Sequence, residues 1–154
     1  MGILKQEPID VSLAFDRQAT SVRTHQFLVN DFQHWMMLSG ISKYDLRSPQ
    51  LDEQLNTRYK SNGQEERVFR IEMATTKVKA IYTAISHCRA DHALLLRLRY
   101  VDDLYDQQVM NQLGIEKTQY YHHRNAALCE FAERLDYWSI MLKAELPSLI
   151  VSGK

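Results

Sequence analysis

The sequence has few of the residues that interrupt helices or cross-link a chain. Its 154 residues include 5 Gly, 3 Pro and 2 Cys. Because Gly and Pro most often end regular structure, their scarcity predicts long uninterrupted helices and an all-α fold. Cys88 and Cys129 lie in apolar segments with helical periodicity. We therefore expect two buried free thiols and no structural disulfide.

The chain also lacks a long apolar run and an excess of charge of either sign. No stretch reaches the roughly 18 apolar residues of a membrane span, and the start MGILKQEPID has no apolar segment of signal-peptide length. These two features predict a cytoplasmic protein, and the length suits one compact domain. The formal net charge is zero. Any contact with nucleic acid must therefore be local, because no broad basic surface is available.

Two long helices are predicted in the N-terminal region, residues 1–90. Apolar residues at spacings of three and four predict one amphipathic helix from Asp16 to Ser39, with Gly40 at its end, and a second from Gln64 to Arg89. Residues 40–63 between them are polar and aperiodic, which is typical of a linker. We interpret the basic residues of the second helix as a solvated face rather than a phosphate-binding face.

Shorter elements are predicted from residue 91 onward. Asp91 is a candidate N-cap for a helix over residues 92–100, because its side chain can accept a hydrogen bond from a free backbone N–H. A short acidic turn follows at 101–104, then a helix over 105–113. A longer helix runs from about Lys117 through Arg134 toward Ala144, and Pro147 bounds it.

The turn between the last two helices has the sequence Leu113-Gly114-Ile115. Gly114 can supply the positive φ of a tight turn, and Ile115 can fill the angle between the helices. The second helix carries apolar or aromatic positions on one face at spacings of three and four: Tyr120, His123, Ala127 and Phe131. A short helix, a tight turn and a longer helix predict a helix-turn-helix DNA-binding region over residues 91–134.

The opposite face of that second helix is polar and would enter a major groove. We expect these residues to read base edges: Thr118, Gln119, Tyr121, His122 and Asn125. Lys117 and Arg124 are the expected phosphate contacts. The acidic residues Asp102, Asp103 and Asp106 would repel phosphate, so the DNA-facing side must exclude them.

The block containing LLRLRY, VMNQLGI and a later Ala-Leu pair resembles region four of bacterial sigma factors, and it is more similar still to the ArpU/RinA family of phage and prophage late-transcription regulators. The resemblance spans roughly residues 13 to 135. It includes Phe15-Asp16 and Thr20, Ser48-Pro49, Glu65-Glu66, Tyr120-Tyr121, Ala127-Leu128 and Phe131-Ala132.

This resemblance implies two long N-terminal helices followed by a sigma region-four-like helix-turn-helix. It also implies a phage- or prophage-encoded activator that binds double-stranded DNA near late promoters and acts with the RNA polymerase of the bacterial host. Two positions depart from the family pattern. Glu116 stands where Ser or Thr usually caps the helix, and His123 stands where an apolar residue is usual.

The last segment, residues 135–154, is unusually apolar and is predicted to form a helical tail. Such a tail has to pack on the early helices or on another copy of the chain. We expect a homodimer, because paired half-sites would offset the weak charge of one module. Two alternatives remain open: a DNA-packaging protein of the small-terminase type, and a polymerase-binding adaptor that touches no DNA.

No motif for catalysis is recognisable. A glycine-rich phosphate loop, a nucleophile elbow and a paired metal-binding histidine motif are all absent, so we expect neither enzymatic activity nor a cofactor. The best candidate for a metal site is the set His87, Cys88, Asp91 and His92, in which pairs are spaced by one helical turn. We favour Asp91 as a helix cap instead, and adjacent His122 and His123 point too far apart to share an ion.

Overall fold

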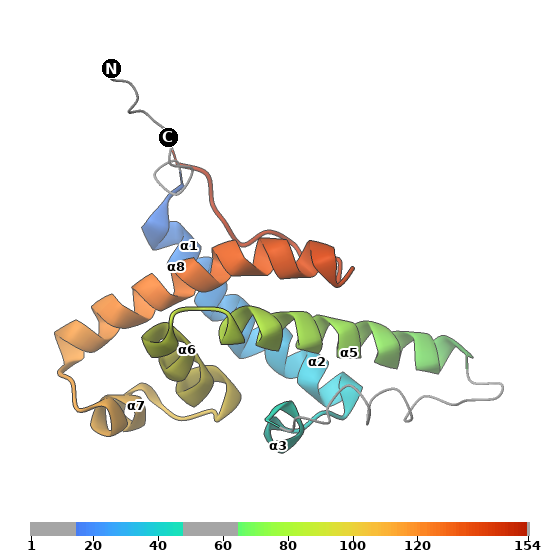
Figure 1. Ribbon diagram of the computed structural model, residues 1–154, viewed down its shortest axis with the longest axis horizontal. Coiled ribbons are helices and arrows are strands. Elements are labelled where there is room, and N and C mark those ends of the chain that lie inside the picture. Colours follow the sequence, from blue (N-terminus) through green and yellow to red (C-terminus); the bar gives the residue numbers. More distant parts are fainter. Residues whose placement is uncertain (1–14, 48–64, 154) are drawn as a thin grey trace.

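Every regular element that the structure describes is helical (Figure 1). The structure is a computed structural model, and it describes residues 15–47 and 65–153. Within these ranges the β-structure amounts to an isolated bridge between Phe15 and Ser152. The elements are α1 (Arg17–Gln26), π-helical η3 (Phe27–Asp31), α2 (Phe32–Ser39), α3 (Lys43–Leu46), α5 (Glu65–Ser86), α6 (Ala90–Leu96), π-helical η4 (Arg97–Val101), α7 (Asp106–Leu113) and α8 (Lys117–Met141).

The first predicted helix forms as a continuous rod of α1, η3 and α2. Asp16 caps its start, because its carboxylate accepts a hydrogen bond from the backbone N–H of Ala19 at 2.9 Å. Gly40 ends it with φ 73°, the left-handed conformation that glycine adopts without steric cost. Both predicted ends are thus confirmed. Of the predicted linker, Lys43–Leu46 form the short helix α3, and residues 48–63 lie outside the described residues.

The second predicted helix is α5, whose apolar stripe enters the main core. Thr75, Val78 and Ile85 are buried, and α5 packs against α2 on one side and α8 on the other (Figure 1). Its predicted first residue, Gln64, lies outside the described residues. The helix ends at Ser86, three residues before the predicted end.

The predicted N-cap of the next helix is wrong. Helix α6 begins at Ala90, its N-cap residue is Arg89, and Asp91 lies in its first turn. Both carboxylate oxygens of Glu130, on α8, accept the backbone N–H of Arg89 at 3.1 Å. A residue 41 positions away therefore performs the task that a local side chain usually performs.

Polar side chains link the π-helical segment η3 of the first rod to the other π-helical segment, η4. A π turn frees carbonyl groups from their usual partners, and the side-chain amide of Gln33 donates to two of them, Leu28 O at 3.1 Å and Tyr100 O at 3.0 Å. The hydroxyl of Tyr100 lies 2.6 Å from Nδ1 of His25. These polar contacts fix η4 against α1 and η3.

The apolar C-terminal segment covers helices of its own chain. Helix α8 ends at Met141, so the helical tail predicted for 135–154 is wrong beyond that residue: residues 142–153 form no helix. The backbone N–H of Val151 donates to Thr20 Oγ1 at 3.0 Å, and Lys77 Nζ donates to Ala144 O at 2.7 Å. Ala144 and Leu149 are buried. Packing on the early helices, one of the two expected arrangements, is thus confirmed.

The core is divided in two. A large cluster joins residues of η3, α2, α5, α6 and α8, and a smaller one consists of Leu95, Val109, Met110 and Tyr120. The buried cysteines Cys88 and Cys129 are free thiols, as predicted. Within the described residues no helix is long and apolar enough to cross a membrane.

Candidate nucleic-acid interface

Helices α7 and α8 meet at a tight turn centred on Gly114. Its φ is 67°, and its backbone N–H, like that of Ile115, donates to the carbonyl of Met110, at 2.8 and 3.2 Å. Both bonds go to one carbonyl group that the end of α7 would otherwise leave free. Ile115 packs against the smaller core cluster. The turn therefore has the geometry that the sequence predicts.

The predicted buried face of α8 is confirmed at most positions. Tyr120, Ala127 and Phe131 are fully buried. His123 is only partly buried, with 28% of its side chain exposed, and it faces α6 rather than the centre of the core. The opposite side of the first turns of α8 is open to solvent. Lys117, Thr118, Gln119 and His122 are exposed there, whereas Tyr121 and Asn125 are half-buried.

Asp106, in the first turn of α7, interacts with two arginines, Arg99 and Arg124. Its Oδ1 accepts a hydrogen bond from Tyr120 Oη at 2.5 Å and from Arg99 Nε at 3.0 Å, and it lies 3.6 Å from Arg124 Nη1. Burial would raise the pKa of Asp106, but the hydrogen bond from Tyr120 and the charges of Arg99 and Arg124 outweigh it, so its pKa is lowered. The carboxylate is therefore ionised at neutral pH.

Arg124 does not reach solvent as a phosphate contact would. Its side chain is 16% exposed, its guanidinium lies 5.0 Å from the centre of the Tyr121 ring, and its Nε is buried without a hydrogen-bond partner. Tyr121 is turned the same way, with its hydroxyl 3.4 Å from Asp106 Oδ2. Of the two predicted phosphate contacts, the structure leaves Lys117 available and directs Arg124 to Asp106.

Of the three acidic residues Asp102, Asp103 and Asp106, two are paired within the chain. Asp102 forms an ion pair with Arg47, at the end of α3, and Asp106 holds Arg99 and Arg124. Asp103 is exposed and adopts a positive φ of 63°. The repulsion of phosphate expected from this acidic run is therefore reduced to the exposed carboxylate of Asp103.

A groove of about 270 Å³ separates α8 from the start of α1. It is lined by Arg17, Gln18, Ser21, His122, Asn125, Ala126 and Cys129. Cys129 Sγ lies 3.3 Å from Arg17 O and joins the two helices there. Arg17 is exposed, so a basic side chain lies next to two of the predicted base-reading residues. No sequence pattern marks Arg17, because its proximity to α8 arises only from the packing of α1.

The disfavoured candidate metal set of His87, Cys88, Asp91 and His92 is not brought together as a unit. His87 Nδ1 bonds to Thr83 O at 2.8 Å, and Cys88 Sγ points back to Ala84 O at 3.4 Å. Burial raises the pKa of the Cys88 thiol to about 12, so it is not a thiolate at neutral pH.

Asp91 and His92 meet a residue of α8 instead. Among the described residues, Asp91, His92 and His123 form the group whose ligand atoms could share a metal ion. Burial and the neighbouring His92 lower the pKa of His123.

The comparisons with known proteins assign no activity. Residues 71–132, from the middle of α5 to α8, match the profile of a family described as a protein of unknown function, DUF1492. No curated protein and no solved structure matches the chain. The matched segment includes α6, α7 and α8 as far as Ala132.

Proposed function

We propose that this protein is a DNA-binding transcription regulator that reads double-stranded DNA with the first turns of α8. One observation carries the proposal: the start of a long helix is held by a tight turn and a dedicated small core, yet its outer side shows exposed Lys117, Thr118, Gln119 and His122. A helix-turn-helix presents its recognition helix in this way, with polar side chains of the first turns directed to the base edges.

The proposed contact surface differs from the one expected from sequence. Thr118, Gln119 and His122 form its centre, and Asn125 borders it at the groove shared with α1. We assign phosphate contact to Lys117 and to Arg17, because both are exposed beside that centre, whereas Arg124 is held by Asp106. Tyr121 contributes by supporting the helix rather than by reading a base.

The resemblance to the ArpU/RinA family supports the finer part of the proposal. On that basis the protein is encoded by a phage or prophage, activates late genes and acts with host RNA polymerase. A homodimer would supply the affinity that one weakly charged surface lacks, since each additional phosphate contact strengthens binding and steepens its salt dependence.

The test is binding of the purified protein to fragments of its own genome at several salt concentrations. Thr118→Ala and His122→Ala are expected to relax base preference, at a cost of about 1–3 kcal/mol on the preferred sequence. Arg17→Ala and Lys117→Ala should weaken all sequences alike and each reduce the salt slope by about one. Binding without sequence preference or salt dependence would refute the proposal.

Arg67→Ala is a matched control for the arginine assignment. Arg67 is exposed, but it belongs to the first turn of α5 rather than to the groove of α1 and α8. Its removal should leave DNA binding unchanged. An equal effect of Arg17→Ala and Arg67→Ala would show that general charge, rather than the groove, determines affinity.

The internal pairing of Arg99 and Arg124 favours a second candidate, a polymerase-binding adaptor that touches no DNA. Because both guanidinium groups are directed to Asp106, little positive charge remains beside the turn. Co-purification of polymerase with no shift of any DNA fragment would support this adaptor role. Light scattering that showed a ring of eight or more subunits would instead support DNA packaging.

A further inference from the structure

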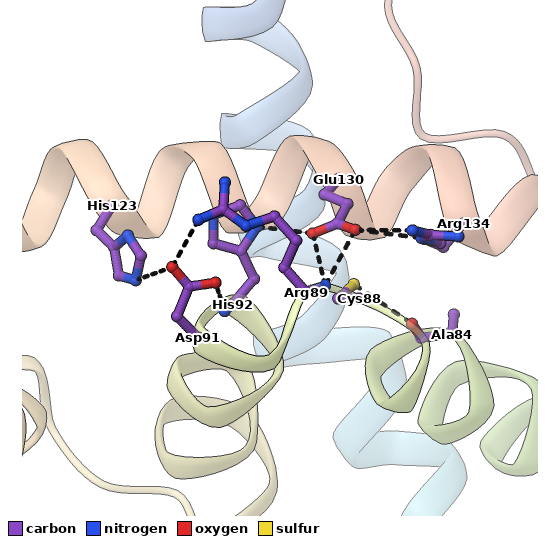
Figure 2. Close-up of polar contacts among 8 residues, drawn as sticks. All are labelled: Ala84, Cys88, Arg89, Asp91, His92, His123, Glu130 and Arg134. Atoms are coloured by element: carbon purple, nitrogen blue, oxygen red, sulfur yellow. Dashed lines mark hydrogen bonds and ion pairs between the residues drawn. The ribbon is translucent and has the colours of Figure 1, made fainter.

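A carboxylate and two imidazoles gather where the first turn of α6 meets α8 (Figure 2). Asp91, His92 and His123 each offer one ligand atom, and these atoms all lie within 4.8 Å of one another. His123 Nε2 is 3.9 Å from Asp91 Oδ2. The two imidazole rings are 5.2 Å apart, centre to centre, and tilted by 59°. They are therefore not stacked on each other, and ligand atoms of all three side chains border one small volume.

A second carboxylate lies behind one of the imidazoles. Glu130 Oε1 is 2.7 Å from His92 Nδ1, and Glu130 itself is held by the backbone N–H of Arg89 and by the guanidinium of Arg134. A carboxylate at this position accepts a hydrogen bond from Nδ1–H, which leaves the lone pair on Nε2. Histidines that bind metals are commonly oriented by a carboxylate in this way. Nothing in the reading of DNA requires such an arrangement.

The size and openness of the cluster suit a small cation. His92 is the buried anchor, with 7% of its side chain exposed, while His123 is 28% and Asp91 46% exposed. Donor atoms around tetrahedral zinc lie about 3.3 Å apart, given bonds of about 2.0–2.1 Å. The two more exposed side chains would have to move inward by up to about 1.5 Å to reach that separation. The solvent side leaves room for water as a further ligand.

We propose that Asp91, His92 and His123 bind a divalent transition-metal ion of the zinc type. Two imidazoles and one carboxylate are donors that favour such ions over Ca²⁺ and Mg²⁺, which prefer oxygen ligands. The ion would link α6 to α8 and so brace the helix that we assign to DNA reading, but the site stands on its own geometry and does not depend on that function.

The guanidinium of Arg89 would compete with the metal ion for the carboxylate of Asp91. Its Nη2 lies 2.8 Å from Asp91 Oδ2, and its side chain is 66% exposed, so the guanidinium can leave when a metal binds. The proposal therefore predicts in which direction the metal affinity changes when the Arg89 side chain is removed. Arg89→Ala should bind the metal several-fold more tightly than the unchanged protein, because the carboxylate no longer has to release a cation.

The experiment uses the full chain, stripped of metal with a chelator and titrated with Zn²⁺ in a calorimeter. We expect one ion per chain, and a rise in melting temperature of about 5 °C or more at a hundredfold excess over Kd. His123→Ala and Asp91→Ala should each weaken binding at least about tenfold. His122→Ala is the matched control, since its imidazole lies next in sequence but outside the cluster, and it should bind as the unchanged protein does.

Co²⁺ provides a second measurement that reports the ligands themselves. Coordination by two imidazoles and a carboxylate should change its visible absorption from that of the hydrated ion, and His123→Gln should abolish the change. Absence of saturable Zn²⁺ binding would overturn the proposal. So would an equal loss of affinity in His122→Ala and His123→Ala, because binding would then lie on the outer surface of α8. The helix signal in far-ultraviolet circular dichroism establishes that each variant is folded.

Discussion

Replacement of Asp106 by asparagine tests the polar cluster that joins α7 to α8. The carboxylate accepts hydrogen bonds from Tyr120 and Arg99 and lies 3.6 Å from Arg124. The side chains of Arg99 and Arg124 are 15% and 16% exposed. Asp106→Asn keeps the size of the side chain and an acceptor oxygen, but it removes the negative charge that offsets two largely buried guanidinium groups.

The expected loss of stability follows from this burial. Removing one partner of a fully buried ion pair costs about 3–5 kcal/mol. Asp106 is 25% exposed, so water screens part of the interaction, and we expect a loss of about 2–3 kcal/mol. In a chain of this length such a loss lowers the melting temperature by about 4–12 °C. Urea unfolding followed by circular dichroism measures the change in free energy of unfolding.

Asp103→Asn is the matched control, because Asp103 is exposed and its replacement should change stability by no more than about 0.5 kcal/mol. The pKa of Asp106 is lowered from 3.8. The stabilisation is therefore present above that unfolded-state value and is lost as pH falls through the lower folded-state value. Equal effects of the two replacements, or a difference between Asp106→Asn and the unchanged protein that does not shrink as pH falls below 3.8, would refute the reasoning.

The remaining predictions concern single positions whose geometry is defined. Gly114→Ala should cost about 1–2 kcal/mol in urea unfolding, since φ is 67° although no atom lies within 4 Å of the added Cβ; Gly114→Asn should cost less, and equal losses would contradict the backbone explanation. Asp16→Ala removes a helix cap and should cost about 1 kcal/mol, whereas Asp16→Asn should restore most of it. Burial and the charge of Arg124 lower the pKa of His25 from 6.5, so stability should fall as pH drops through 6.5 toward the folded-state value. His25→Asn should show a smaller fall in melting temperature over that range, and an unchanged pH dependence would contradict the assignment.

Local signals in the sequence predict much of the helical fold. Asp16, Gly40 and Gly114 act on backbone groups within a few residues of themselves, so their roles as cap or turn residues are visible without a structure. The buried face of α8 is likewise a matter of spacing, and Tyr120, Ala127 and Phe131 occupy it as predicted. The end of α8 at Met141 is close to the expected extension toward Ala144. The helical tail predicted beyond it is wrong, because those apolar residues pack on α1 and α5 without forming a helix.

The candidate sites depend on partners that are distant in sequence. The sequence alone indicates that Arg124 is a free basic residue. In the structure, α7 places Asp106 Oδ1 3.6 Å from Arg124 Nη1. The sequence alone indicates that Asp91 caps a helix. In the structure, the carboxylate of Glu130, on α8, accepts the backbone N–H of Arg89 at the start of α6 instead. Spacing along one helix relates residues of that helix alone, and it cannot show which acid or histidine another helix will place opposite.

Because the C-terminal segment pairs with α1, the helices of this domain pack in a fixed order during synthesis. The backbone N–H of Asp16 donates to Val151 O at 2.8 Å, and Phe15 bridges to Ser152. During synthesis, α1 therefore emerges from the ribosome long before the residues that complete its packing exist. Helices α2 and α5 can associate early, since neither needs the last ten residues to make their mutual contact. Closure of the domain around α1 must wait until translation has passed residue 151.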